Sequence, residues 1–194
     1  MRAGKQPRER GAVRRGVTAP TLNVISENPA HTAALGAALA DWLRDGDVVL
    51  LHGDLGAGKT TLVKGIAAAL RVDDVVSSPS FAFVNEYEGG LLAPVTMLYH
   101  LDLYRLQGVD ELASIGYEDY ISRMDGVTVI EWPERASGSL PERYLLVEIT
   151  AIGEDRRQLR MAPSPNDETW SSRFADLRRH FDAVNAANGG HQGQ

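Results

Sequence analysis

The feature that most constrains the fold is a match to the phosphate-binding pattern GxxxxGK[ST] at residues 53–60. A short apolar run precedes it at residues 48–51, and apolar residues at helical spacing follow at residues 59–70. The glycines allow a tight loop whose amide groups face inward, and the next helix directs the positive end of its dipole at the same point. This order predicts a phosphate-binding loop in an α/β domain.

The loop residues predict which groups bind a nucleoside triphosphate. Lys59 is expected to contact the β- and γ-phosphates as a point charge, and the hydroxyl of Thr60 to ligate Mg²⁺. We therefore expect ATP and Mg²⁺ as cofactors. The cofactor-binding residues expected in the loop are Gly53, Asp54, Leu55, Gly56, Ala57, Gly58, Lys59, Thr60 and Thr61.

Strand and helix patterns alternate along the rest of the chain, which predicts a P-loop NTPase-type domain of three layers with a largely parallel central sheet. The last two strands, joined by a turn at Gly153, predict an antiparallel C-terminal hairpin. The expected strands are residues 22–25, 48–51, 81–87, 96–101, 127–130, 144–149 and 158–161, and the expected helices are residues 29–43, 59–70, 110–121 and 169–184.

Composition divides the chain into four segments. Residues 1–20 form a basic extension that we expect to be disordered, with an over-long start assignment, a transit peptide or an RNA-binding arm as alternatives. Residues 21–162 form the expected P-loop ATPase domain. Residues 163–185 are expected to be a linker and a C-terminal helix, and the polar residues 186–194 a disordered tail.

Charge and cysteine content exclude several classes of protein. The chain has no cysteine, so thiol catalysis, disulfides and thiolate zinc sites are excluded. No apolar run approaches the roughly 20 residues of a membrane-spanning helix, and we expect a cytoplasmic protein without a membrane partner. The formal net charge is −6 although residues 1–20 are basic, so the body is acidic and a poor surface for nucleic acid.

Two apolar strands end in a carboxylate that can complete the site, Asp102 after residues 95–101 and Glu131 after residues 127–130. Ligands of open parallel sheets bind beyond the carboxyl ends of the strands, and Mg²⁺ prefers oxygen ligands. Either acid alone is as compatible with a cap or a salt bridge as with catalysis. Together with the loop, they predict Lys59, Asp102 and Glu131 as catalytic residues, with either acid positioning the attacking water.

Two further positions suggest a switch or a partner surface. Residues 77–81 read Ser-Ser-Pro-Ser-Phe, which suits either an ordinary turn or a segment whose Ser80 senses the γ-phosphate or its metal. Trp132 follows Glu131 directly. It fits the core, or a lid or partner surface where an apolar ring meets a polar rim.

Four motifs in this order, GDLGAGKTT, SSPSF, HLDLYRL at residues 100–106 and EWPER at residues 131–135, resemble the TsaE family, also called YjeE. The resemblance covers roughly residues 26–161. It implies a P-loop ATPase of tRNA threonylcarbamoyladenosine biosynthesis that hydrolyses ATP weakly alone. It also implies assembly with TsaB and TsaD, which modify adenosine 37 of tRNA, so that tRNA is contacted only through the complex.

The resemblance also implies roles for individual residues. Thr60 and Glu131 correspond to the Mg²⁺ ligands of the family, and Asp102 to the acid required for hydrolysis. Trp132 corresponds to a residue that matters for activity, while Thr32 and Arg156 lie where the family contacts the adenosine end of the nucleotide. The chain has Ser80 where threonine is commoner, which keeps the hydroxyl and loses the methyl group.

Two other functions share parts of this pattern. A small-molecule or nucleotide kinase can have the same loop, but the arginines expected of its lid are concentrated here in the tails and in pairs such as Arg156 and Arg157. A nucleotide-gated binding module with negligible turnover differs from an ATPase only in degree. A metal hydrolase is disfavoured, because no two of His31, His52, His100, His180 and His191 stand at metal-ligand spacing.

Overall fold

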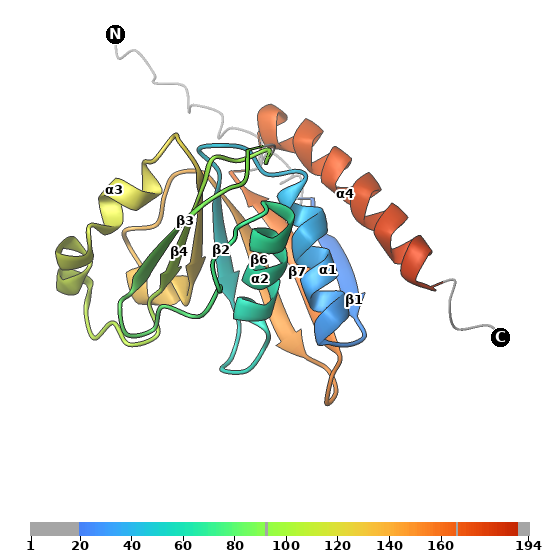
Figure 1. The fold of residues 1–194 in the computed structure, drawn as a ribbon, viewed down its shortest axis with the longest axis horizontal. Coiled ribbons are helices and arrows are strands. Elements are labelled where there is room, and N and C mark those ends of the chain that lie inside the picture. Colours follow the sequence, from blue (N-terminus) through green and yellow to red (C-terminus); the bar gives the residue numbers. More distant parts are fainter. Residues whose placement is uncertain (1–19, 92, 166, 190–194) are drawn as a thin grey trace, which may run out of the picture.

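A computed structural model describes residues 20–91, 93–165 and 167–189, and the expectations for residues 1–19 and 190–194 fall outside this range. Seven strands form one sheet in the order β1-β7-β6-β2-β5-β4-β3 (Figure 1). The strands are β1 (Leu22–Ser26), β2 (Val48–His52), β3 (Val84–Glu88), β4 (Met97–Asp102), β5 (Val127–Glu131), β6 (Tyr144–Ala151) and β7 (Arg157–Ser164). The α-helices are α1 (Pro29–Ala40), α2 (Lys59–Ala69), α3 (Tyr117–Ile121) and α4 (Glu168–Gly189).

The sheet is mixed rather than largely parallel, which corrects the expectation from the sequence. Strands β6, β2, β5 and β4 pair in parallel, whereas β1 with β7, β7 with β6, and β4 with β3 pair antiparallel. The hairpin of β6 and β7 is antiparallel as predicted. The central strands β2, β4 and β5 are mainly apolar and almost wholly buried, as expected of strands covered on both faces.

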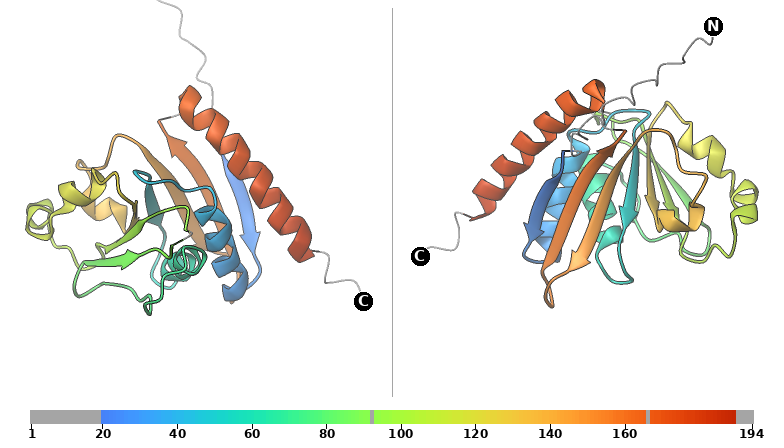
Figure 2. Two further views of the ribbon diagram at one scale, coloured as in Figure 1. Left: turned by 45° about the horizontal axis from the view of Figure 1, so that its top comes forward. Right: turned by 180° about the vertical axis from the view of Figure 1, so that it is seen from behind.

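Alternate residues of β2 point into two separate cores. Val49 and Leu51 pack with α1, α2 and α4, whereas Val48 and Leu50 pack with the segment that contains α3. The segment that covers this second face is short and packs mainly on β2, β5 and β4, with Val84 of β3 and Tyr144 and Leu146 of β6 at its margin. Seen from behind, β1, β7 and β6 have no helix in front of them, so the expected three layers are complete over only part of the sheet (Figure 2).

Several elements have other bounds than the sequence predicts. The single helix expected at residues 110–121 is two 3₁₀-helices, η1 (Val109–Glu111) and η2 (Ala113–Ile115), followed by the one-turn α3. Gly116 causes the break, because its φ of +68° cannot continue a helix. Strand β3 starts late, at Val84, since the turn before it places Phe83 at a φ of +66°.

The linker expected between residue 163 and the C-terminal helix is shortened by β7, which continues to Ser164. Pro163 is tolerated there because β1 pairs with β7 only as far as Met161, and beyond that point β7 is an edge strand. Helix α4 extends to Gly189 and therefore includes residues that we expected in the disordered tail. Its apolar stripe, formed by Trp170, Phe174, Leu177 and Phe181, is buried in the first core.

Arg173 ties α4 to the start of β2. Its guanidinium packs beside the paired rings of Trp42 and Trp170, 4.5 and 5.1 Å from their centroids, and donates two hydrogen bonds of 2.6 and 2.9 Å to the carboxylate of Asp47. None of the helices in the described ranges is long and apolar enough to cross a membrane.

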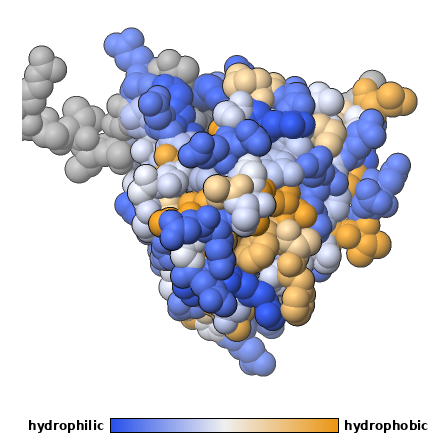
Figure 3. Space-filling view, turned by 90° about the vertical axis from the view of Figure 1, so that its left-hand side faces the viewer, coloured by the Kyte–Doolittle hydropathy of each residue, from blue (hydrophilic) through white to orange (hydrophobic). Residues whose placement is uncertain are grey.

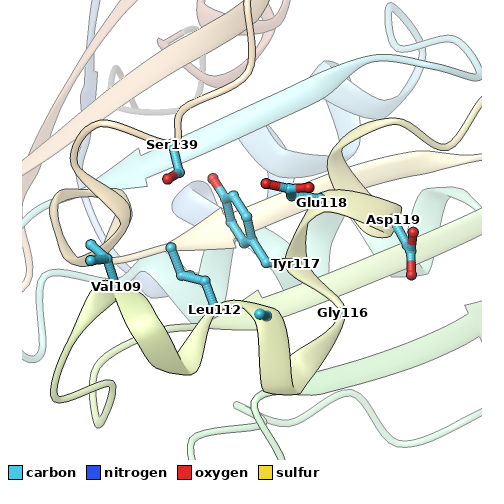
Figure 4. A pocket seen from close by; sticks show the side chains of 8 residues that line it. Val109, Leu112, Gly116, Tyr117, Glu118, Asp119 and Ser139 are labelled. Atoms are coloured by element: carbon cyan, nitrogen blue, oxygen red, sulfur yellow. The ribbon is translucent and has the colours of Figure 1, made fainter.

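At the surface of the second core, a pocket of about 290 Å³ opens between the segment 109–119 and Ser139. The ring of Tyr117 forms one wall, and its hydroxyl points between Ser139 and Glu118 (Figure 4). This hydroxyl is buried and has no hydrogen-bond partner among the described residues, and burial raises the pKa of Tyr117 to about 12. On the outside of this region, apolar side chains are exposed in patches between hydrophilic ones (Figure 3).

Helices α1 and α2 touch through glycines, which generates the first prediction. A Cβ atom on Gly65 of α2 would lie 1.9 Å from the carbonyl oxygen of Ala33. We expect Gly65→Ala to lower the free energy of unfolding by about 1–3 kcal/mol in urea titrations, because a backbone clash outweighs the gain in helix propensity. Gly108→Ala is the matched control, since a Cβ there meets nothing within 4 Å. Equal stability of the two variants would contradict the close packing.

The unpartnered hydroxyl in the second core generates the second prediction. Tyr117→Phe removes a buried polar group without changing the ring, so we expect the free energy of unfolding to rise by about 1 kcal/mol. Tyr99→Phe is the control, because its hydroxyl is hydrogen-bonded to Asp125 at 3.1 Å and to Arg123 at 2.7 Å. The control variant should lose stability, and a comparable loss for Tyr117→Phe would mean that its hydroxyl has a partner.

Candidate active site

The loop between β2 and α2 adopts a conformation that depends on its glycines. Gly56 and Gly58 have φ angles of +78° and +103°, in the left-handed region. Gly53 lies so close to β6 that a Cβ would be 2.3 Å from the carbonyl oxygen of Ile149. Gly58 precedes α2 without a side-chain cap, so the first amide groups of the helix are left for a ligand.

Lys59 is buried at the start of α2 and points back into the loop. Its Nζ donates hydrogen bonds to the carbonyl oxygens of Gly53, at 2.7 Å, and Asp54, at 2.9 Å. The same nitrogen lies 3.9 Å from the ring centroid of Trp132. Burial lowers the pKa of Lys59, and the nearby carboxylates of Glu131 and Asp102 oppose this shift. The ammonium group is therefore held in the loop by carbonyl groups and an aromatic face.

Asp102 and Glu131 lie side by side at one edge of the sheet. They are partners in the parallel register of β4 and β5, and Glu131 is also the partner of Leu51 at the end of β2. Their side chains are almost fully buried. The parallel pairing thus brings both predicted acids to the loop, as expected for carboxyl ends of neighbouring strands.

Glu131 connects this edge to α2. Its Oε1 accepts hydrogen bonds from the hydroxyl of Thr60, at 2.8 Å, and from Nε2 of His100, at 2.9 Å. A threonine hydroxyl and a carboxylate in contact are the hard oxygen ligands that Mg²⁺ prefers. The described residues hold no cluster of three or more His, Asp or Glu side chains that could form a metal site of protein groups alone. This set fits Mg²⁺, which takes phosphate and water oxygens for its other ligands.

Asp102 faces the segment of Ser77 to Ser80. Its Oδ2 accepts a short hydrogen bond from the hydroxyl of Ser78, whose Oγ also lies 3.1 Å from Oγ of Ser80, within hydrogen-bond distance. Its Oδ1 accepts from the backbone N–H of Tyr104 at 3.0 Å. The serine segment is therefore attached to the carboxylate through Ser78 rather than directly through the predicted Ser80.

Trp132 adopts a left-handed backbone conformation, with φ of +60° and ψ of +50°, immediately before Pro133. This conformation costs a residue with a Cβ about 1–2 kcal/mol. The half-buried indole packs on Tyr104, with ring centroids 4.9 Å apart, and on the ammonium group of Lys59. The strained backbone thus turns the indole over the loop, where it forms a wall of the site.

The loop, the serine segment and the two strand ends line an open cavity of about 360 Å³. The structure brings ten of the predicted residues together in its lining. These are Leu55, Gly56, Gly58, Lys59, Thr60, Thr61, Ser80, Asp102, Glu131 and Trp132.

The other predicted residues lie outside this lining. Gly53 and Asp54 contribute carbonyl groups to Lys59, and Ala57 is buried in the first core. Thr32 is buried and hydrogen-bonded to Ser26 at 2.7 Å, with its methyl group near Gly58. Arg156 is exposed and forms an ion pair with Glu27 at 2.8 Å.

Sequence reasoning missed two residues that contact the site. His100, a strand residue of the HLDLYRL motif, binds Glu131 from within β4. Arg157, the neighbour of the predicted Arg156, donates hydrogen bonds to the carbonyl oxygens of Ala57, at 3.0 Å, and Gly56, at 3.4 Å. Only its place in the hairpin beside the loop reveals this contact, and no spacing in the sequence indicates it.

The comparisons with known proteins agree with this architecture. The family described as "Threonylcarbamoyl adenosine biosynthesis protein TsaE" matches residues 26–159. The protein of that family from Bacillus subtilis is 35% identical over 158 residues, which cover 81% of this chain and 94% of the relative. The relative from Treponema pallidum is 34% identical, with coverage of 73% of this chain and 100% of its own.

A solved structure shows the same fold. The crystal structure of YdiB from Bacillus subtilis superposes with a TM-score of 0.67 and 32% sequence identity, and the match covers 85% of this chain and 99% of that chain. The family match extends across the loop, the serine segment and both strand ends. The chain therefore belongs to the TsaE family.

Proposed function

We propose that this chain is an ATPase that binds ATP with Mg²⁺ and supports formation of the threonylcarbamoyl modification on adenosine 37 of tRNA. The observation that carries the ATPase part is the contact of Thr60 with Glu131 beside the glycine loop, with Asp102 next to them. The pathway rests on membership of the TsaE family.

The geometry supports a distinct role for each residue. Lys59 and the loop amides bind the phosphates and neutralise the negative charge that develops on them. Thr60 and Glu131 hold Mg²⁺, which polarises the phosphoryl oxygens when it is bound. Asp102 lines the cavity without contacting Thr60, so it is the acid left to orient the attacking water.

We propose TsaB and TsaD as partners, on the strength of the resemblance of the motifs to the family. The acidic body supports contact with tRNA through such a complex rather than directly. Arg105 lines the cavity, but its guanidinium stacks 4.1 Å above the ring of Phe81. A charge-stabilising group supplied by a partner would explain low activity of the isolated chain, because such a group adds about 10³–10⁵ in rate in other systems.

The phosphate-binding role of Lys59 is tested by Lys59→Ala. We expect calorimetry with ATP and Mg²⁺ to show no measurable binding, because the variant lacks the only side-chain cation assigned to the phosphates. Lys64→Ala on the same helix is the control, since Lys64 is exposed and outside the cavity lining, and it should bind as the wild type does. Unchanged affinity of Lys59→Ala would contradict the loop assignment.

The role of Asp102 is tested by Asp102→Asn, which keeps the shape of the side chain. Nucleotide affinity should stay close to that of the wild type, while phosphate release in the presence of TsaB and TsaD should fall about 100-fold or more, as for other groups that orient or deprotonate a nucleophile. Unaltered turnover would transfer the water-positioning role to Glu131.

A further inference from the structure

We propose that His100 is the positioning residue that fixes the carboxylate of Glu131 for Mg²⁺. The proposal rests on the function proposed above and adds a residue to which neither the motifs nor the family resemblance assigned a role. It stands on the burial of the histidine, the geometry of its contact and the unequal use of its two ring nitrogens.

His100 lies on β4, the last strand of the parallel group, between β5 and the edge strand β3. In β4 it is the register partner of Asn85 on one side and of Val129 on the other, and its side chain is fully buried. Nε2 lies 2.9 Å from Oε1 of Glu131, whose side chain is only 3% exposed. Water therefore does not compete for this contact, and a buried hydrogen bond to a charged group is stronger than an exposed one.

The two nitrogens of the ring have unequal surroundings. Nδ1 is buried and has no hydrogen-bond partner among the described residues. A carboxylate oxygen only accepts, so Nε2 must carry the proton that it donates to Glu131. An unpartnered buried nitrogen costs free energy, which an apolar side chain of similar size would avoid. Packing alone therefore does not explain an imidazole here, whereas orienting the carboxylate does.

Of the two side chains that donate hydrogen bonds to Glu131, only His100 is left to orient the carboxylate. Thr60 also donates to Oε1, but its hydroxyl is itself a proposed ligand of Mg²⁺. His100 lies behind the carboxylate and is not part of the cavity lining. Within the described residues, Oε2 of Glu131 has no hydrogen-bond partner, so this oxygen is available to a metal while His100 holds the other.

Removing a hydrogen-bond partner of a metal ligand typically lowers metal affinity 10–100-fold. His100→Leu removes the donor, whereas His100→Gln places an amide N–H near the position of Nε2. Calorimetry with a nonhydrolysable ATP analogue, once with Mg²⁺ and once with EDTA, separates the metal-dependent part of binding from the rest.

We expect His100→Leu to lose 10–100-fold in affinity with Mg²⁺ and to bind the analogue unchanged in EDTA. His100→Gln should recover most of the loss. Tyr99→Phe, the neighbouring strand residue outside the site, controls for general destabilisation of β4 and should keep the Mg²⁺ dependence. If the leucine variant does not fold, the glutamine variant is compared with His100→Asn, whose shorter amide does not reach Glu131.

Three results would overturn the proposal. If His100→Leu lost the same affinity with Mg²⁺ and in EDTA, His100 would act on the fold. The same conclusion would follow if His100→Gln had the same Mg²⁺ dependence as His100→Leu or, where the leucine variant does not fold, as His100→Asn. A wild-type protein whose nucleotide binding does not depend on Mg²⁺ would instead remove the proposed metal site itself, and the role of His100 with it.

Discussion

The parallel pairing of β2, β5 and β4 is the constraint on which the candidate site depends. Strand β5 pairs with both neighbours, so Leu51, Glu131 and Asp102 end at one edge of the sheet. The glycine loop leaves β2 at the same edge and returns α2 across it, which brings Thr60 to Glu131. One register shift in β5 would turn Glu131 to the opposite face and separate it from Thr60.

A strained backbone and a buried charge lie at this edge of the sheet, and hydrogen bonds and ring contacts there offset their cost. Trp132 has a left-handed backbone, and Lys59 is removed from water. The carbonyl groups of the loop and the indole ring surround the ammonium group, while the backbone N–H of Trp132 binds the carbonyl oxygen of Leu51 at 3.2 Å. Such strain supports the proposal that this edge is a ligand site organised before the ligand arrives.

The sequence predicted the parts of the molecule whose signal is local. Buried central strands appear as apolar runs, and the glycine loop has a fixed spacing, so β2, β5 and the start of α2 agree with the structure. Strand direction is not encoded in such runs, and the mixed sheet was therefore described as largely parallel. The region 110–121 has a helical apolar pattern, but Gly116 breaks it, because conformational freedom at one residue outweighs periodicity.

Side-chain contacts between residues far apart in the sequence could not be predicted. His100 reads as an ordinary strand residue until the register of β4 against β5 places it beside Glu131. Arg157 looks equivalent to Arg156, yet one binds the loop carbonyl groups and the other an exposed glutamate. Both distinctions depend on side-chain direction across neighbouring strands, which a single sequence does not record.

Helix α4 determines where the chain can be truncated without loss of the fold. The region that matches the family ends at residue 159, inside β7 and before the whole of α4. Four apolar side chains of α4 complete the first core, and Arg173 donates a hydrogen bond to the carboxylate of Asp47, the residue before β2. Truncation at the limit of family likeness would therefore open the interior and loosen the strand that leads into the glycine loop.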